Sequence, residues 1–401
     1  MTLSVVVTGW GNRSWVSWFL LICINSSGQR SGYIAAQLVV CLAAVSCVAC
    51  SSSHAAEPLP RAAELKLRAA LVAIEDVNSE AVEAWRADGI NAIALMLDDS
   101  TDETEKSHYK SAALKVIDSE LELYYWVEVA RCPLLANAHP MWMASQQTHP
   151  EWKRLFRDVP TPGPQQVVKT YPWVPILSRE TFTAQKQRVQ QLLSDLPEAT
   201  GVFLNDIQGA PSACGCGNPL CRWTSDYGKR RSTTPLDSDA AAMFVEEIKK
   251  FVPQSQVIPV WVTECEEHDG AADGLCAGVG CFDGICWKSY TAQLAPVETS
   301  CSAIAVLATY KQFHRDVAVY GPTAGWIHSI VASFQSMPAK YGHAPVASSR
   351  LIPVLQGWNV NNDELAAQIR QVESEDVQGY VIAYAEIEQG WEPKLADWTR
   401  D

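Results

Sequence analysis

Several features that would assign a chemistry directly are missing from this chain of 401 residues. No Gly-x-Gly-x-x-Gly segment follows an expected strand, and no phosphate-binding loop is present, which disfavours a nucleotide cofactor. Gly-x-Ser-x-Gly is absent, and the 8 histidines form no Ser/His/Asp or Cys/His arrangement with a recognisable spacing. The sequence therefore offers no motif for nucleotide-dependent chemistry or for an activated serine or cysteine nucleophile.

Positive charge is also scarce. The chain has 31 basic and 45 acidic residues, a formal net charge of −14, and no Lys/Arg-rich segment. Because nucleic acids and anionic membrane surfaces attract positive charge, both are poor partner candidates. The 19% charged and 48% hydrophobic composition is that of a globular protein. One domain of roughly 250 residues or more fits this length as well as two smaller domains do.

Residues 1–56 are expected to be an export leader outside the fold. Arg30 precedes an apolar run, Tyr33–Cys50, and the small residues up to Ala56 suit signal-peptidase cleavage. Two cysteines within this run follow small residues and weakly resemble a lipobox, so a lipid-anchored form is the alternative. No later stretch approaches ~18 consecutive apolar residues. The mature protein is therefore expected in the periplasm or outside the cell, without a membrane span.

Apolar runs alternate with helix-period segments from Ala69 onward, which predicts βα units and a parallel sheet. The eight expected strands are Ala69–Ile74, Ile90–Leu97, Leu123–Val129, Val202–Asp206, Val257–Val262, Ala303–Ala308, Leu351–Leu355 and Tyr380–Tyr384. Eight such units favour an α/β fold with a single (β/α)8 TIM barrel over residues 57–401. An open doubly wound sheet is the alternative.

Two further features of this barrel can be read from the pattern. A helix expected over 237–252 should turn Met243, Phe244, Ile248 and Phe251 inward, because these residues keep a helical spacing. A long insertion, residues 132–178, follows the third strand, and loops of that length are usually functional or form a subdomain. Cysteine-rich loops follow the fourth and fifth strands.

The site of such a barrel lies at the carboxyl ends of its strands. Glycosidic cleavage needs one carboxylic acid to protonate the leaving oxygen and one carboxylate to attack or to activate water. Strands four and five are neighbours, so Asp206 and Glu264 should face each other across the barrel mouth. We expect these two carboxylates to be the catalytic pair, although a single strand-end acid is more often a helix cap or an ion-pair partner.

Polar and aromatic residues at the same end are the expected substrate contacts, because an apolar sugar face packs on an indole ring. They are Asp98, Glu128, Arg131, Asn205, Trp142, Trp223, Trp261, Tyr310, Trp358 and Glu386. Trp85 and Trp126 are expected in the core instead. The ligand predicted from this set is a carbohydrate or another small polar molecule.

The cysteines allow two interpretations. Cys214-x-Cys216-x4-Cys221 resembles a metal-ligand cluster that needs one more ligand, which would make a structural zinc site. An oxidising compartment favours disulfides instead, and the nine cysteines after the leader leave at least one outside any disulfide. In either case the cysteines would brace the loops after strands four and five, and we expect no catalytic cofactor. Candidates for the additional zinc ligand are Cys265, Cys276, Cys281, Cys286 and His268.

The segment Gly201–Asp206 together with these three cysteines resembles a family of glycoside-hydrolase-like (β/α)8 barrel proteins of bacteria. In that family the fourth strand ends in an acidic pair and leads into a Cys-x-Cys-x2-Cys cluster. The resemblance implies the barrel fold and a carbohydrate substrate. By the same analogy, α-amylase-like barrels carry a nucleophile after strand four and an acid/base after strand five, which implies Asp206 and Glu264. This chain differs in its longer last cysteine spacing and in having Asn205 in place of the first acid.

Three functional hypotheses follow. The first is an exported glycoside-hydrolase-like protein that uses Asp206 and Glu264. The second is a non-catalytic glycan-binding or cell-envelope protein on the same barrel. The third is a metal-dependent hydrolase that uses His139, His149 or His268.

Overall fold

The computed structural model describes residues 67–98, 103–139, 142, 166–169, 172, 174–176, 178–207, 240–261, 294–295, 297–298, 300–309, 324–385 and 394–397. The chain divides into two compact units, Met1–Pro60 and Arg61–Asp401. All described residues belong to the second unit, and the predicted leader lies outside them.

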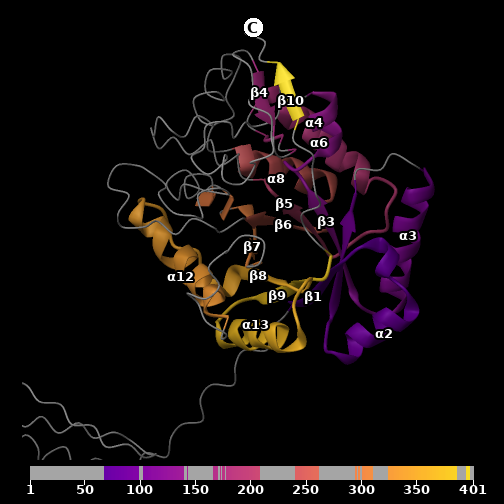
Figure 1. Ribbon diagram of the computed structural model, residues 1–401, viewed down its shortest axis with the longest axis vertical. Coiled ribbons are helices and arrows are strands. Elements are labelled where there is room, and N and C mark those ends of the chain that lie inside the picture. The colour runs from indigo at the N-terminus through magenta and orange to yellow at the C-terminus, as the bar shows by residue number, and fades with distance from the viewer. Residues whose placement is uncertain are drawn as a thin grey trace, which may run out of the picture. The chain divides into compact units, whose positions relative to one another are not determined.

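Eight parallel strands close into a barrel in the order β1-β2-β3-β5-β6-β7-β8-β9 (Figure 1). The strands are β1 Leu67–Val72, β2 Ala92–Leu97, β3 Glu122–Glu128, β5 Gly201–Asn205, β6 Gln256–Trp261, β7 Ile304–Leu307, β8 Leu351–Gln356 and β9 Gly379–Ala383. The ring closes where β1 pairs with β9, from Leu67 opposite Gly379 to Leu71 opposite Ala383. This closure confirms the predicted TIM barrel and excludes the open doubly wound sheet.

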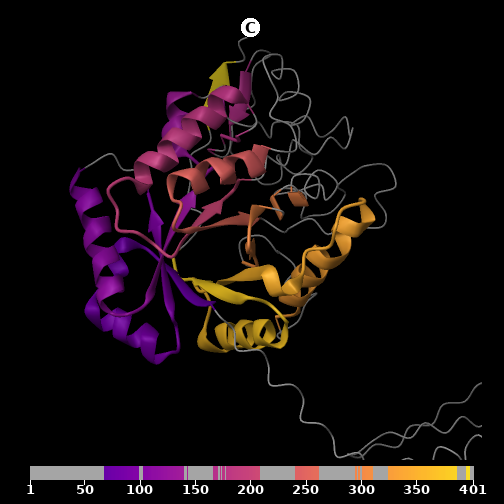
Figure 2. The ribbon, with the colours of Figure 1, turned by 180° about the vertical axis from the view of Figure 1, so that it is seen from behind.

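Helices follow the strands and surround the barrel (Figures 1 and 2). They are α2 Ser79–Ala87, α3 Glu103–Asp118, α4 Pro133–Ala138, α6 Arg179–Leu193, α8 Ala240–Phe251, α12 Gly325–Lys340 and α13 Asn362–Ser374, with short 3-10 turns η1 Ile74–Asp76 and η6 Ser348–Arg350. Ser178 caps α6, because its side chain accepts from the Thr181 N–H. Helices α6 and α8 lie side by side, with the rings of Phe182 and Phe244 in edge contact at 5.4 Å.

The strand register decides which side chains point into the barrel. In β3 the Tyr125 hydroxyl donates to the carbonyl of Pro197, just beyond α6, so this face of the strand meets the helix layer. Successive side chains of a strand point to opposite faces. Tyr124, Trp126 and Glu128 therefore point into the barrel, and so does Phe203, which lies opposite Trp126 on β5.

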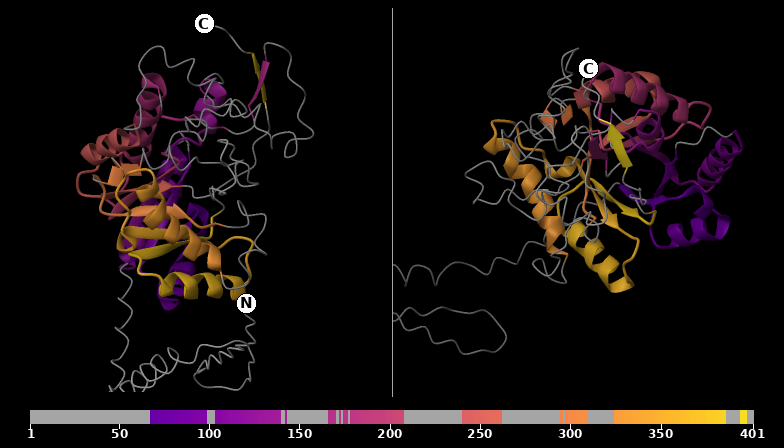
Figure 3. Two further views of the ribbon diagram at one scale, coloured as in Figure 1. Left: turned by 90° about the vertical axis from the view of Figure 1, so that its left-hand side faces the viewer. Right: turned by 45° about the horizontal axis from the view of Figure 1, so that its top comes forward.

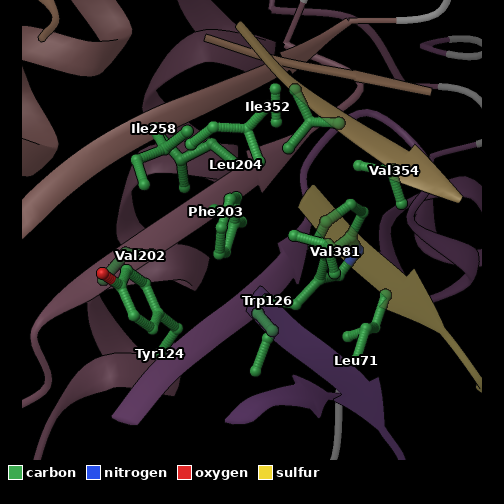
Figure 4. Close-up of a cluster of buried hydrophobic side chains, with 14 of the residues drawn as sticks. Leu71, Tyr124, Trp126, Val202, Phe203, Leu204, Ile258, Ile352, Val354 and Val381 are labelled. Carbon is green, nitrogen blue, oxygen red and sulfur yellow. The ribbon is translucent and has the colours of Figure 1, made fainter. Parts of the chain in front are cut away.

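Large side chains fill this interior. Figure 4 shows apolar and aromatic side chains from several strands gathered in one cluster. The centroid of the Phe203 ring lies 5.4 Å from that of the Tyr124 ring and 5.5 Å from that of the Trp126 ring. Gly201 leaves room for the Tyr124 ring, because a Cβ added at Gly201 would lie only 2.7 Å from Cε1 of that ring. The barrel interior is thus a packed core rather than a channel from the amino ends of the strands to their middle.

Two sequence predictions need correction. The first expected strand is displaced by two residues, since β1 begins at Leu67 and Ile74 belongs to the 3-10 turn η1. In α8, Phe244 and Ile248 are buried as predicted, but Met243 and Phe251 are 45% and 41% exposed. Met243 is rotated by about 100° from Phe244 on the helix, and Phe251 is the last helical residue.

The insertion of residues 132–178 contains secondary structure of its own. Besides α4, its described residues include strand β4, Gln166–Lys169, which pairs antiparallel with β10, Lys394–Asp397. Figure 3 shows these two strands side by side outside the ring of barrel strands. The insertion is therefore joined to the C-terminal segment by backbone pairing. Among the described helices, none has the length and apolar character needed to cross a membrane.

Candidate functional site

At the described part of the barrel mouth, buried polar side chains meet where β3 and β5 end. The last residues of these strands, Glu128 and Asn205, lie directly opposite each other in the parallel register. The pairing continues one step further, because the Val129 N–H donates to the Asn205 carbonyl at 2.9 Å. Both side chains lie on the interior face of the barrel, at the carboxyl ends of the strands where sites of this fold are built.

The Glu128 carboxylate is buried, with 8% of the residue exposed. Its Oε1 accepts a hydrogen bond from the indole Nε1 of Trp126 at 2.7 Å. Its Oε2 accepts from Nδ2 of Asn205 at 2.8 Å. An ionised carboxylate accepts and does not donate, so these two N–H donors match it at both oxygens. We refer to these three side chains as the Trp126–Glu128–Asn205 network.

The amide of Asn205 is only half satisfied by this network. The residue is 1% exposed, and its Oδ1 has no hydrogen-bond partner among the residues that the structure describes. A buried acceptor without a partner costs roughly 1–3 kcal/mol. Such an atom at a barrel mouth is a position where a ligand or a bound water would be stabilised.

Arg188 of α6 fixes the end of β3 from the outside. This residue is 8% exposed, and its Nη2 donates to the carbonyls of Glu128 and Val129, the latter at 3.0 Å. Its Nε donates to Oε1 of Gln185 at 2.9 Å, and Gln185 in turn donates to the Val174 carbonyl at 2.9 Å. A charged guanidinium thus donates to main-chain carbonyls at the carboxyl end of β3.

Asp206 follows Asn205 directly and is 4% exposed. Its backbone has a φ of 56°, in the left-handed region that Asp and Asn adopt more readily than other side chains. A non-glycine residue in this conformation carries strain on the order of 1 kcal/mol, and strain of this kind clusters at functional sites. The predicted nucleophile is therefore a buried carboxylic acid residue at a sharp turn after the fourth barrel strand.

Other predicted contacts lie around this centre. Asp98 is exposed, and its N–H donates to the Tyr109 hydroxyl at 2.8 Å, while burial raises the pKa of Tyr109 to about 12. Arg131 is half-buried and lies three residues after Glu128. Trp142 is half-buried and stacks on the His139 ring at 3.8 Å, so one indole face is covered.

The two predicted tryptophans on or next to β6 and β8 have different surroundings. Trp261 is fully buried. Ile258 lies opposite Phe203 and therefore points into the barrel, and Val260, two residues later, points the same way. Trp261 follows Val260 directly, so its side chain points to the opposite face of β6, toward the helices. The structure therefore corrects the expectation of an exposed stacking surface at this residue. Trp358 is half-buried, and its carbonyl accepts from Nε2 of the buried Gln356 at 3.1 Å.

Several predicted residues lie outside the described part of the chain, and nothing follows for them from the structure. They are Glu264, Trp223, Tyr310, Glu386, His149, His268 and the cysteines Cys214, Cys216, Cys221, Cys265, Cys276, Cys281 and Cys286.

Metal and thiol chemistry can be assessed only within the described ranges. There, no group of three or more His, Cys, Asp or Glu side chains is arranged to hold a metal ion. Cys132 and Cys301 are both buried, and neither forms a disulfide. Burial raises the pKa of the Cys301 thiol to about 12, which keeps it protonated and unreactive. The zinc interpretation, and the disulfide interpretation for the other seven cysteines after the leader, concern residues outside these ranges and stay predictions.

Sequence reasoning missed two members of this site. Trp126 was expected in the core, and it is fully buried there, but its indole also binds Glu128. The signal was the Trp-x-Glu spacing, because residues two apart on a strand share a face. Arg188 was missed because it is remote in sequence; the available signal was a basic residue next to Val189 on the buried stripe of a helix.

No protein-family model matches this chain, and no curated protein matches it. Solved structures with a similar arrangement include α-L-fucosidase isoenzyme 2 from Paenibacillus thiaminolyticus, with a TM-score of 0.42, 12% identity, and coverage of 79% of this chain and 46% of that one. A class V chitinase from Pseudomonas fluorescens gives 0.36, 11%, 72% and 68% in the same order. An HpcH/HpaI aldolase from Desulfitobacterium hafniense gives 0.31, 8%, 79% and 86%. This chain thus spans less than half of the fucosidase, and it is the strand pairing described above that makes it a (β/α)8 barrel protein.

Proposed function

We propose that the protein is an exported glycoside hydrolase that cleaves a carbohydrate at the carboxyl-terminal mouth of its barrel, with Asp206 and Glu264 as the catalytic pair. The observation that carries the proposal is the buried Trp126–Glu128–Asn205 network immediately before Asp206. It places fixed polar groups, an unmatched acceptor and a strained acidic residue at the ends of two adjacent barrel strands.

The two proposed carboxylates follow neighbouring strands. β5 and β6 pair in parallel from Gly201 opposite Gln256 to Leu204 opposite Pro259, and Asp206 and Glu264 come after the ends of these strands. One would act as nucleophile or base and the other as general acid. A carboxyl separation of about 5 Å would give retention of the anomeric configuration, and one of roughly 6.5–9.5 Å would give inversion.

Glu128 has a different role in this proposal. Both of its oxygens already accept hydrogen bonds from protein donors, and Arg188 fixes its main-chain carbonyl. A carboxylate held in this way is suited to orienting a neighbouring group rather than to proton transfer. We therefore assign Glu128 to positioning Asn205 and leave the proton chemistry to the proposed pair.

The same engagement of Glu128 favours one alternative, a glycan-binding protein without catalysis. Such a protein would bind a polysaccharide saturably and release no product. The third hypothesis, a metal-dependent hydrolase, would require a metal bound by histidines of which only His139 lies in the described part. Elemental analysis of the purified protein distinguishes it from the other two.

The deciding experiment measures hydrolysis of a panel of activated aryl glycosides and of polysaccharides by the purified protein and three variants. Asp206→Asn and Glu264→Gln each remove one carboxylate without changing the side-chain shape, and each should lower turnover by about 10²–10⁴-fold. Glu83→Gln, at an exposed position on α2, is the matched control and should leave turnover unchanged. Unchanged turnover in the first two variants would remove the catalytic assignment, and binding without product from the parent protein would support the glycan-binding alternative.

A further inference from the structure

The orientation of the Asn205 amide is determined by its neighbour. A side-chain amide has a donor end and an acceptor end, and the two can exchange places by a half-turn. An ionised Glu128 carboxylate only accepts, so it pairs with the donor end of the amide, and Nδ2 lies 2.8 Å from Oε2. The acceptor Oδ1 must then face the other way.

Glu128 is itself held by hydrogen bonds at both carboxylate oxygens. The Trp126 indole donates to Oε1 at 2.7 Å, and an indole N–H is a donor only. The main chain at Glu128 accepts from Arg188 and pairs with β5. Both hydrogen bonds of the network therefore end on the Glu128 carboxylate: the Trp126 indole donates from one side and the Asn205 amide donates from the other, so the amide presents its acceptor away from Glu128.

The acceptor atom Oδ1 of Asn205 determines which chemical groups can bind to it. Oδ1 of Asn205 is buried and has no partner among the described residues, so it can take one hydrogen bond from a donor. The Glu128 carboxylate beside it adds negative charge, which attracts a donor hydrogen and repels an anionic group. A carboxylate or sulfate on a ligand brings only acceptors and a like charge to this position.

We propose that the Trp126–Glu128–Asn205 network is a specificity-determining element that selects a hydroxyl of an uncharged sugar and disfavours acidic sugars at this position. The inference rests on the proposed function for the ligand class, a carbohydrate, and adds the charge state that the site accepts. It assigns Asn205 the contact and Glu128 the positioning of that contact.

Two variants test the two parts of the network. Asn205→Ala removes the acceptor and should weaken the binding of neutral sugars by about tenfold, the worth of one hydrogen bond. Glu128→Gln keeps the shape but supplies a donor, so the Asn205 amide can turn round and present Nδ2 instead. In that variant the preference for neutral over acidic sugars should fall by roughly tenfold, through a gain for the acidic sugars as well as a loss for the neutral ones.

The probes are glucose, galactose and mannose paired with their uronic acids, with dissociation constants measured by ligand-observed NMR on the whole mature protein. Glu122→Gln and Gln256→Ala are matched controls, because both residues share the interior phase of the network but lie exposed at the opposite end of the barrel. Neither control should change the preference. Circular dichroism verifies that each variant is folded.

The outcomes separate the two proposals. Binding of neutral sugars that is lost in Asn205→Ala and altered in charge preference by Glu128→Gln supports the inference. Sugar binding with a preference that neither variant changes overturns the inference and leaves the proposed function standing. Absence of any sugar binding overturns the proposed function and the ligand class with it. A crystal structure with a bound sugar gives an independent result: a sugar oxygen about 3 Å from Oδ1 supports the inference, and a water molecule alone at Oδ1 overturns it.

Discussion

Strand β3 carries two aromatic–glutamate pairs that point in opposite directions along the same interior face. At the amino end the Tyr124 hydroxyl donates to Oε2 of Glu122 at 3.1 Å, and at the carboxyl end the Trp126 indole donates to Oε1 of Glu128 at 2.7 Å. Glu122 is exposed, whereas Glu128 is 8% exposed. The same type of hydrogen bond, from an aromatic side chain to a glutamate, is thus exposed to solvent at one end of the strand and buried at the other.

The neighbouring strand β5 sharpens this difference. Opposite Tyr124 it places Gly201, which leaves room for the ring, and opposite Glu128 it places Asn205, which binds the second carboxylate oxygen. One end of the strand pair is therefore a close-packed aromatic contact with a wet rim. The other end is a buried polar network whose hydrogen bonds cannot be replaced by water without reopening the core.

The largest effect should come from removing the buried carboxylate. Glu128→Ala leaves the Trp126 indole and the Asn205 amide without their acceptor and opens a cavity, which should lower the free energy of unfolding by about 4 kcal/mol. Glu122→Ala should cost less than about 1 kcal/mol, because water replaces the lost contact. Urea denaturation followed by tryptophan fluorescence measures both. Equal losses in the two variants would show that burial does not distinguish the two ends.

The next largest effect is expected from Arg188, which binds the carboxyl end of β3, in comparison with Arg86, which pairs with Glu120 just before β3. Arg188→Met keeps the length of the side chain but leaves the carbonyls of Glu128 and Val129 without their donor, and should cost about 3 kcal/mol. Arg86 forms an exposed pair with Glu120 at 3.5 Å, so Arg86→Met should cost no more than about 0.5 kcal/mol. Thermal unfolding of the two variants compares them directly, and a loss in Arg86→Met as large as that in Arg188→Met would contradict the assignment.

The fold could be predicted from the sequence because a parallel barrel produces a repeated local pattern of residues. Each strand is buried on both faces and reads as a short apolar run, as Ala92–Leu97 does, and helical spacing marks the segment after it. All eight expected strands exist, with ends displaced by one or two residues. Those displacements arise because an apolar residue such as Ile74 can belong to a 3-10 turn as readily as to a strand.

The site was only partly predictable. Glu128, Asn205 and Asp206 were expected at strand ends, and the structure places the first two in direct contact. Their contact depends on the register between β3 and β5, which are separated by more than seventy residues and which no local pattern specifies. The outward direction of Trp261 was missed because burial on both faces removes the alternation that would have shown it.

A smaller effect should follow from filling the gap at the amino end. In Gly201→Ala the new Cβ would lie 2.7 and 2.9 Å from the Tyr124 ring and 3.0 Å from the Gln256 carbonyl, so the ring or the backbone must move. We expect a loss of about 2 kcal/mol in unfolding free energy. In a Tyr124→Ala background the same change should cost much less, because the ring is gone. A double-mutant cycle by urea denaturation measures this coupling, and additive costs would rule out the ring contact as the cause.

The smallest effect should come from neutralising the exposed glutamate. Burial, and then the charge of Glu122, raise the pKa of Tyr124 above its ordinary value, so the folded protein holds this phenol neutral. The unfolded chain loses the proton near pH 10, so this contribution is complete below that pH and falls as the pH rises further. Glu122→Gln should change stability at pH 7 by only a few tenths of a kcal/mol. Because the variant removes the second cause and leaves burial, it should lower the pKa of Tyr124 in the folded protein. Tyrosinate absorbance of the folded protein at pH values above 11 tests this, with Tyr124→Phe as the control that removes the titrating group, and an unchanged pKa of Tyr124 would mean that solvent screens the amino-terminal pair completely.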